Sequence, residues 1–219
     1  MVYAALGCLI LVWCVVMPGK CHFERTKQRA LEIICKTLAT LLVAGLAATA
    51  LLDGQADLPA KLILVGLCVC AAADAMLELV FPVGGALFFT GHVIYIAAFL
   101  LLRPLTWWSL AVFVPLLALL LYILFGRYRN EIHAAHPLLI VGLTVYAVAL
   151  SSMVSTALPT PFLAFSPRML CAAVGAVLFL ISDATLLRNT LLERPAKDRF
   201  ISLGIYYTGQ LLIACAAIF

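Results

Sequence analysis

The chain alternates long apolar stretches with short polar breaks along its whole length. Most stretches hold roughly 20 residues, the length that an α-helix needs to cross ~30 Å of hydrocarbon, and Pro or Gly marks most of the breaks. The pattern predicts an all-α, polytopic membrane helical bundle of eight transmembrane helices. The predicted spans are Tyr3–Met17, Leu31–Leu52, Ala60–Leu79, Gly84–Leu102, Trp107–Phe125, Pro137–Leu158, Ser166–Leu187 and Phe200–Phe219.

The composition agrees with lipid as the solvent. Of the 219 residues, 66% are hydrophobic and 11% are charged, whereas a soluble domain carries about 25% charged residues. The unbroken apolar run from Leu116 to Phe125 excludes a β-barrel, whose strands alternate polar and apolar residues. We expect residues 1–219 to form a single transmembrane domain. Its first apolar stretch has its basic residues after it, which favours a retained span over a secretory signal.

Basic residues concentrate in every second loop, which predicts the orientation of the chain. The loops after the first, third, fifth and seventh spans contain Lys20, Arg25, Lys27, Arg29, Arg127, Arg129, Arg188, Arg194, Lys197 and Arg199, and the opposite side contains Lys61, Arg103 and Arg168. By the positive-inside rule, the first set is cytoplasmic and both termini are non-cytoplasmic. No basic strip with interleaved aromatic residues occurs, so we do not expect a nucleic-acid partner.

Several polar side chains fall inside the predicted spans, where an ionisable group costs several kcal/mol and usually faces a cavity or a partner. With the predicted orientation, most lie within about two turns of the cytoplasmic face. This clustering predicts a pocket open to the inner leaflet. Its candidate residues are Lys36, Asp74, Glu78, His92, Tyr95, Tyr146, Asp183, Tyr207 and Gln210.

Each candidate also has an interpretation without function. Lys36 is close enough to the interface to extend its ammonium there, Glu78 is placed to be a solvated carboxylate at the rim, and His92 could be a packing residue. Asp74 and Asp183 are harder to explain in this way, because a carboxylate at that depth needs a partner or a proton.

Two carboxyl groups in a desolvated pocket favour a state in which one is protonated and the other ionised. Such a pair can act as general acid and general base on a bound substrate. No G-x-S-x-G elbow, phosphate loop or dinucleotide fingerprint is present, and we expect no cofactor. Of the four histidines, His92 alone falls inside a span. We therefore predict no metal site, although metal-assisted hydrolysis through His92 and the two aspartates stays open.

A short sequence similarity suggests an internal repeat. Asp74-Ala-Met-Leu ends the third span and Asp183-Ala-Thr-Leu ends the seventh, four spans later. The span that follows each one carries polar residues in its first half. Two parallel four-helix repeats, with halves 1–106 and 107–219, would explain this, and chance similarity is the alternative.

The order of these signals resembles the YhhN-type lysoplasmalogenase family of eight-span membrane proteins, over nearly the whole chain. Ala73 and Thr37 stand where that family usually has Gly and often has Pro, a difference that affects helix geometry more than chemistry. The matching segments are Cys35-Lys36-Thr37-Leu38, Ala73-Asp74-Ala75-Met76-Leu77, Gly91-His92-Val93-Ile94-Tyr95, Ala98-Phe99, Phe179-Leu180-Ile181-Ser182-Asp183 and Tyr206-Tyr207-Thr208-Gly209-Gln210.

The resemblance implies hydrolysis of the vinyl ether bond of a lysoplasmalogen, a lysophospholipid substrate taken from membrane lipid. Asp74 and Asp183 would divide the acid and base roles in an order that the sequence leaves open. Lys36 would meet the phosphate and Glu78 the head-group ammonium. The remaining candidates, His92, Tyr95, Tyr146, Tyr207 and Gln210, would orient these groups. The alternative is a proton-coupled transporter or a lysolipid-binding membrane protein, for which a polar site near the midplane is typical.

Overall fold

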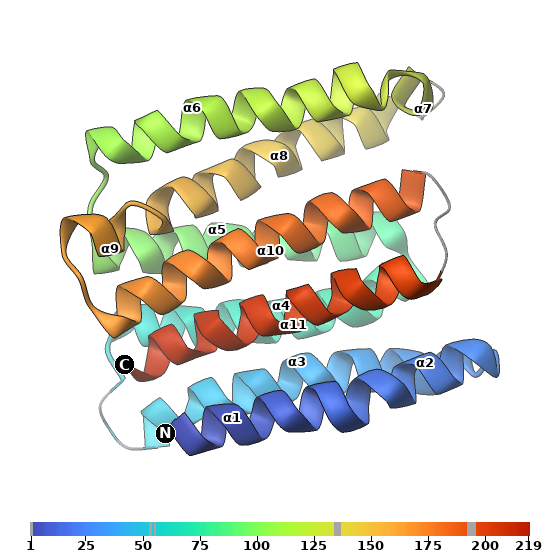
Figure 1. Ribbon diagram of the computed structural model, residues 1–219, viewed down its shortest axis with the longest axis horizontal. Helices are drawn as coiled ribbons and strands as arrows, with labels where there is room; N and C mark the ends of the chain where they lie inside the picture. The colour runs from blue at the N-terminus through green and yellow to red at the C-terminus, as the bar shows by residue number, and fades with distance from the viewer. Residues whose placement is uncertain (1, 53, 55, 134–136, 192–195) are drawn as a thin grey trace.

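The computed structural model describes residues 2–52, 54, 56–133, 137–191 and 196–219, which form long helices packed side by side (Figure 1). No strand occurs in these ranges. The elements are α1 (Val2–Leu11), the π-helical turn η1 (Val12–Val16), α2 (Met17–Arg25), α3 (Arg29–Leu52), α4 (Leu58–Leu79), α5 (Phe81–Leu102), α6 (Trp107–Tyr122), the π-helical turn η2 (Ile123–Arg127), α7 (Arg129–His133), α8 (Pro137–Ala157), α9 (Thr160–Leu163), α10 (Pro167–Leu191) and α11 (Ala196–Ile218).

The described residues contain eight helices long and apolar enough to cross a membrane, which confirms the predicted fold class. The first of these spans is longer than predicted. It continues through Pro18 and Gly19 to the end of α2, because the wide π-turn η1 precedes Pro18 and the proline lies in the first turn of α2. A proline in a first turn lacks an N–H that would have no intrahelical partner there in any case. For the same reason α5 begins at Phe81, three residues before the predicted Gly84, with Pro82 in its first turn.

The helices pack in two layers (Figure 1). α11 packs against α10, α3 and α4, while α8 contacts both α5 and α10 and carries α6 on its outer side. The apolar core lies between the layers and includes Phe99, Phe179 and Tyr207. α6 is the least enclosed of the spans, so most of its apolar surface faces outward.

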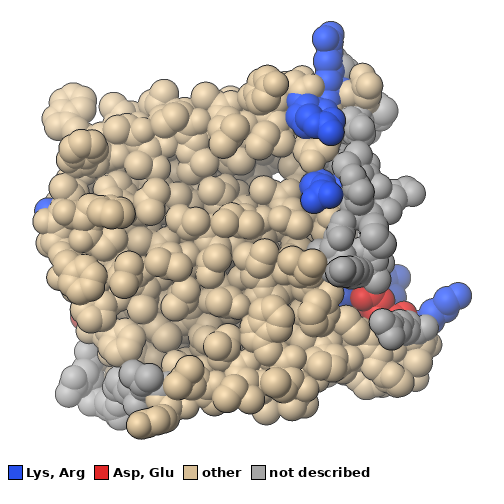
Figure 2. Space-filling model, viewed as in Figure 1, with Lys and Arg blue, Asp and Glu red and all other residues tan. Residues whose placement is uncertain are grey.

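Both termini lie at one end of the bundle, which we call the terminus end (Figure 1). The opposite end, where α2, α4 and α10 finish, is called the basic end because most of the visible lysine and arginine side chains gather there (Figure 2). Arg194 lies outside the described residues, as do the side chains of Arg25, Lys197 and Arg199. The two ends separate the charges as the sequence predicts, while the side of the membrane that each faces stays a prediction.

Two helix pairs approach each other closely at glycines. A Cβ on Gly66 of α4 would lie 2.5 Å from the Tyr95 ring of α5, and a Cβ on Gly175 of α10 would lie 2.9 Å from the Gly209 carbonyl oxygen of α11. Small residues let backbones approach in this way inside a membrane. Gly66 precedes Asp74 by eight residues and Gly175 precedes Asp183 by eight. The correspondence adds to the sequence similarity of the predicted halves, which stay a prediction.

An arginine ties three helices together at the terminus end. Arg168, in the first turn of α10, donates to both carboxylate oxygens of Asp57 at 2.6 and 2.7 Å. Its Nε donates to the carbonyl of Ala216 in the last turn of α11 at 2.8 Å. Asp57 also caps α4 by accepting from the Ala60 amide at 2.9 Å. The hydrogen bonds from Arg168 hold the pKa of Asp57 below its ordinary value. We call this arrangement the Arg168 clasp.

Candidate functional site

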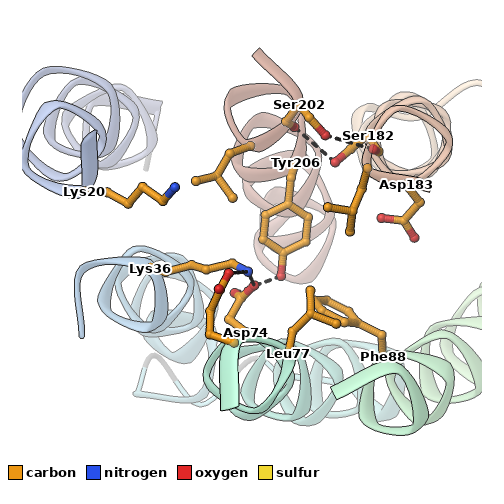
Figure 3. A pocket seen from close by; sticks show the side chains of 12 residues that line it. Lys20, Lys36, Asp74, Leu77, Phe88, Ser182, Asp183, Ser202 and Tyr206 are labelled. Atoms are coloured by element: carbon orange, nitrogen blue, oxygen red, sulfur yellow. Dashed lines mark hydrogen bonds and ion pairs between the residues drawn. The ribbon is translucent and has the colours of Figure 1, made fainter. Parts of the chain in front are cut away.

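A cavity of about 80 Å³ opens at the basic end between α2, α3, α4, α5, α10 and α11 (Figure 3). It has room for a few water molecules, since each takes ~30 Å³ of liquid volume. Charged and hydroxyl groups line one part of its wall and apolar side chains the rest. The lining residues are Lys20, Lys36, Asp74, Leu77, Glu78, Phe88, Ser182, Asp183, Leu186, Ser202, Leu203 and Tyr206.

Asp74 lies in the first of two polar clusters, and 1% of its surface is exposed. It accepts hydrogen bonds from the hydroxyls of Thr40 at 2.5 Å and Tyr206 at 3.0 Å. The ammonium of Lys36 lies 3.9 Å from its other oxygen and donates to Glu78 at 3.0 Å. Lys36 and Thr40 are four residues apart on α3, and Asp74 and Glu78 are four apart on α4, so each pair shares one helix face. Two hydroxyl donors and a cation favour the ionised form of Asp74.

Asp183 lies in the second cluster, with residues of α5 and α8. It accepts a short hydrogen bond from the Tyr146 hydroxyl, and Nε2 of His92 lies 3.8 Å from the same carboxylate oxygen. Nδ1 of His92 lies 2.6 Å from the Phe88 carbonyl, which can only accept, so Nδ1 carries a ring proton, and in the neutral imidazole Nε2 is the nitrogen with the free lone pair. Nε2 then presents a lone pair toward Asp183, and no described residue donates to it.

Aromatic rings separate the two clusters. The Phe179 ring lies 4.7 Å from His92 on one side and 5.3 Å from Tyr206 on the other, measured between ring centroids. In the view of Figure 3, Asp74 and Asp183 occupy opposite sides of the cavity with Tyr206 between them. The structure therefore brings both predicted aspartates to one cavity but gives each its own set of partners.

Three further candidates, Tyr95, Tyr207 and Gln210, hold residues of the cavity wall in place through hydrogen bonds. Tyr95 donates to Gln210 at 2.8 Å, and Gln210 donates to the Tyr206 hydroxyl at 3.1 Å. Tyr206 in turn donates to Asp74, so a chain of hydrogen bonds links α5 to the first cluster through α11. Tyr207 instead donates to the backbone carbonyl of Lys36 at 3.1 Å and joins α11 to α3. None of Tyr95, Tyr207 and Gln210 lines the cavity itself.

Several residues that the structure places at the site were not selected from the sequence, among them Lys20, Thr40 and Tyr206. Thr40 had a usable signal, because it follows Lys36 by four residues and shares its helix face. Tyr206 directly precedes Tyr207, which was selected. Lys20 was assigned to a loop, because Pro18-Gly19 suggested the end of a helix that in fact continues.

A second cavity of about 600 Å³ lies near the terminus end between α5, α6 and α8. Its wall includes Trp107, Leu110 and several hydroxyl residues. Of these hydroxyls, those of Ser152 and Thr156 donate to carbonyls of their own helix at 2.8 to 3.0 Å. Among the residues that the structure describes, none that lines this cavity is ionisable.

Within the described part of the chain, no three His, Cys, Asp or Glu side chains are close enough to hold a metal ion, and no disulfide joins the cysteines. Eight apolar spans around a cavity lined by carboxyl groups define a polytopic membrane protein with an ionisable site at one end. Residues 31–217 match the model of the YhhN family, and the chain belongs to that family. No protein of curated function and no solved structure matches the chain.

Proposed function

We propose that this protein is a membrane-embedded hydrolase that cleaves the vinyl ether bond of lysoplasmalogens. The products are a fatty aldehyde and glycerophosphocholine or glycerophosphoethanolamine. Membership of the YhhN family is consistent with such a hydrolase. The observation that carries the proposal is the pair of aspartates, the buried Asp74 and the partly buried Asp183, which line one cavity with different partners.

The reaction needs an acid and a carboxylate. Protonation of the β-carbon of the vinyl ether gives an oxocarbenium ion. Water then adds to the α-carbon and loses a proton to a base, and the resulting hemiacetal breaks its bond to the glycerol oxygen. The glycerol oxygen takes the proton that the base had accepted, and the hemiacetal hydroxyl gives its proton to the ionised acid as the aldehyde forms. One water molecule is consumed and both groups are restored. A carboxylate beside the cation stabilises it because the site excludes most solvent.

We assign the proton to Asp183 and the negative charge to Asp74. Asp183 faces the lone pair of His92 Nε2, an arrangement that suits a protonated carboxyl group or a bridging water. Asp74 receives two hydroxyl donors and lies near Lys36, which suits a carboxylate. Asp183 would then protonate the β-carbon, and Asp74 would stabilise the cation and accept the proton of the attacking water.

The other residues would position these groups. Lys36 would meet the lipid phosphate while it balances Asp74, and Glu78 would meet the head-group ammonium. Tyr146 and His92 would orient Asp183. Tyr95, Tyr207 and Gln210 would act through their neighbours, because they hold Tyr206 and the α3 backbone in place. The hydrocarbon chain would leave the cavity sideways between the helices.

Aldehyde release by the purified protein in detergent tests the proposal. Lysoplasmalogen should yield aldehyde without added nucleotide, and Asp74→Asn and Asp183→Asn should each lower the turnover by about 10²- to 10⁴-fold, the usual contribution of a general acid or base. Asp57→Asn, which removes a carboxylate at the opposite end, is the matched control and should retain turnover. Full activity in either site variant contradicts the two-aspartate mechanism. A parallel reaction with a chelator reports any need for a metal.

The position of the cavity favours hydrolysis over the alternative of a proton-coupled transporter. A transporter site near the midplane is reached from both ends in turn, whereas this cavity lies at the basic end and the Arg168 clasp joins the helices at the other. A lysolipid-binding protein without turnover would retain lysoplasmalogen in the same assay and release no aldehyde.

We further propose that the basic end faces the cytoplasm, in line with the positive-inside rule. Both termini would then lie on the non-cytoplasmic side. A reporter enzyme that is active only outside the cytoplasm should work when it is fused to the C-terminus, and activity of a cytoplasm-dependent reporter at that position contradicts this orientation.

A further inference from the structure

Lys20 is a buried lysine of the first span that lines the same cavity as the two aspartates, with 8% of its surface exposed. Its ammonium donates to Glu24 of the same helix at 2.7 Å and lies 3.1 Å from Glu32 of α3. An ammonium has three N–H donors, and these two carboxylates account for two of them. In Figure 3 the side chains of Lys20 and Lys36 enter the cavity from the same side.

Charges of both signs therefore lie together around the part of the cavity that α2, α3 and α4 enclose. Lys20 and Lys36 are the cations, and Glu32 and Glu78 are their partners across helix boundaries. A purely anionic ligand would meet the carboxylates unfavourably, and a purely cationic ligand would meet the lysines unfavourably. A ligand that carries a phosphate and an ammonium a few bonds apart can satisfy both signs at once.

We propose that Lys20 and Glu32 form a head-group site that selects zwitterionic lysophospholipids. The phosphate lies between the ammonium groups of Lys20 and Lys36, and Glu32 joins Glu78 in binding the amine of the head group. This inference rests on the proposed hydrolysis and adds Lys20 and Glu32 to the residues that bind the head group. Lipids with phosphate but no amine bind less well, and glycerol ethers without phosphate do not use the site at all.

The first span is held in the orientation that this site requires. The ring of Trp13, in η1, lies where a Cβ of Gly204 on α11 would stand, and its Nε1 donates to Thr208 at 3.3 Å. Because η1 is a π-turn, it contains more residues than an α-helical turn and changes the face that α2 presents. The family match begins at residue 31, so Lys20 comes from outside the matched region.

Steady-state kinetics with four vinyl ethers test the site: 1-alkenyl-glycerophosphoethanolamine, 1-alkenyl-glycerophosphocholine, 1-alkenyl-glycerol phosphate and 1-alkenyl-glycerol. A hydrogen bond to a charged group contributes about 10- to 100-fold in affinity. Lys20→Met should raise KM by about that factor for the three phosphate-containing substrates and leave 1-alkenyl-glycerol unchanged. Lys20→Arg should restore much of the loss. Lys61→Met, at an exposed lysine near the terminus end, is the matched control and should leave KM unchanged for all four substrates.

Glu32→Gln should narrow the preference for the ethanolamine substrate over 1-alkenyl-glycerol phosphate, because the variant loses the charge that attracts the amine. If Lys20→Met raises KM equally for all four substrates, or for none of them, the head-group site is wrong. Aldehyde release by the parent protein would still support the hydrolase. If the parent protein releases no aldehyde, the hydrolase fails instead. In that case, native mass spectrometry with lysophosphatidylethanolamine tests whether Lys20 binds the head group. Unchanged binding by Lys20→Met overturns the site.

Discussion

The close contact between α4 and α5 at Gly66 makes a sharp prediction about stability. A Cβ at position 66 would lie 2.5 Å from Cε1 and 2.8 Å from Cδ1 of the Tyr95 ring. Tyr95 is fully buried and its hydroxyl is fixed by Gln210, so the ring has no free direction in which to move. Gly66→Ala should therefore separate the helices or displace the ring.

The expected cost combines two effects. Overpacking of a filled core costs about 1–3 kcal/mol, and loss of the buried hydrogen bond between Tyr95 and Gln210 adds about 1 kcal/mol. For a protein of this size the sum of about 2–4 kcal/mol lowers Tm by roughly 5–15 °C. Because Gln210 also holds Tyr206, which donates to Asp74, Gly66→Ala should reduce aldehyde release at temperatures below its Tm.

Thermal unfolding in dodecyl maltoside, followed by far-ultraviolet circular dichroism, measures the effect. Gly45→Ala and Gly142→Ala are the controls, because a Cβ at either helical position meets no atom within 4 Å. They should leave the protein as stable as before or stabilise it by about 0.5–1 kcal/mol, the benefit of removing glycine from a helix interior. If Gly66→Ala unfolds at the same temperature as these controls, the inferred contact at Tyr95 is wrong.

Two further predictions concern the two ends of the bundle. Asp57→Asn keeps an N-cap but removes the ion pair with Arg168, and should lower the stability by about 0.2–1 kcal/mol at neutral pH because the pair is solvent-exposed. Since the pKa of Asp57 is lowered in the folded protein, the difference in Tm between variant and parent should be full above about pH 4 and should close as the pH falls through the lowered pKa. A difference in Tm that persists at lower pH contradicts the ion pair. Tyr146→Phe removes the donor to Asp183 and should lower kcat about tenfold with little change in KM or Tm, whereas a rise in KM alone would place Tyr146 in substrate binding.

The eight spans could be predicted from the sequence because the bilayer imposes a minimum length of apolar helix. The positions of Asp74 and Asp183 at one cavity could also be expected, since a carboxyl group inside a span needs a partner or a polar space. Both expectations depend only on position along a helix, which hydropathy reveals.

The partners of each aspartate could not be predicted, because they depend on how neighbouring helices are rotated. The pairing of Lys36 with Glu78 and the contact of His92 with Asp183 each join different helices, and no local pattern encodes them. Lys20 was missed for a related reason. The π-turn before Pro18 adds a residue to the helix and rotates α2 by about 100° relative to α1, which hydropathy does not register.

The Arg168 clasp also has a mechanical consequence. It fastens the first turn of α10 to the start of α4 and the end of α11, so these helices share a fixed point at one extremity. α10 has 25 residues and is ~37 Å long. At that length, a tilt of about 5° about the clasp displaces the far end of the helix by ~3 Å. The largest displacements from such a tilt therefore fall where the cavity opens, so small angular changes alter the width of the opening and leave the fastened end intact.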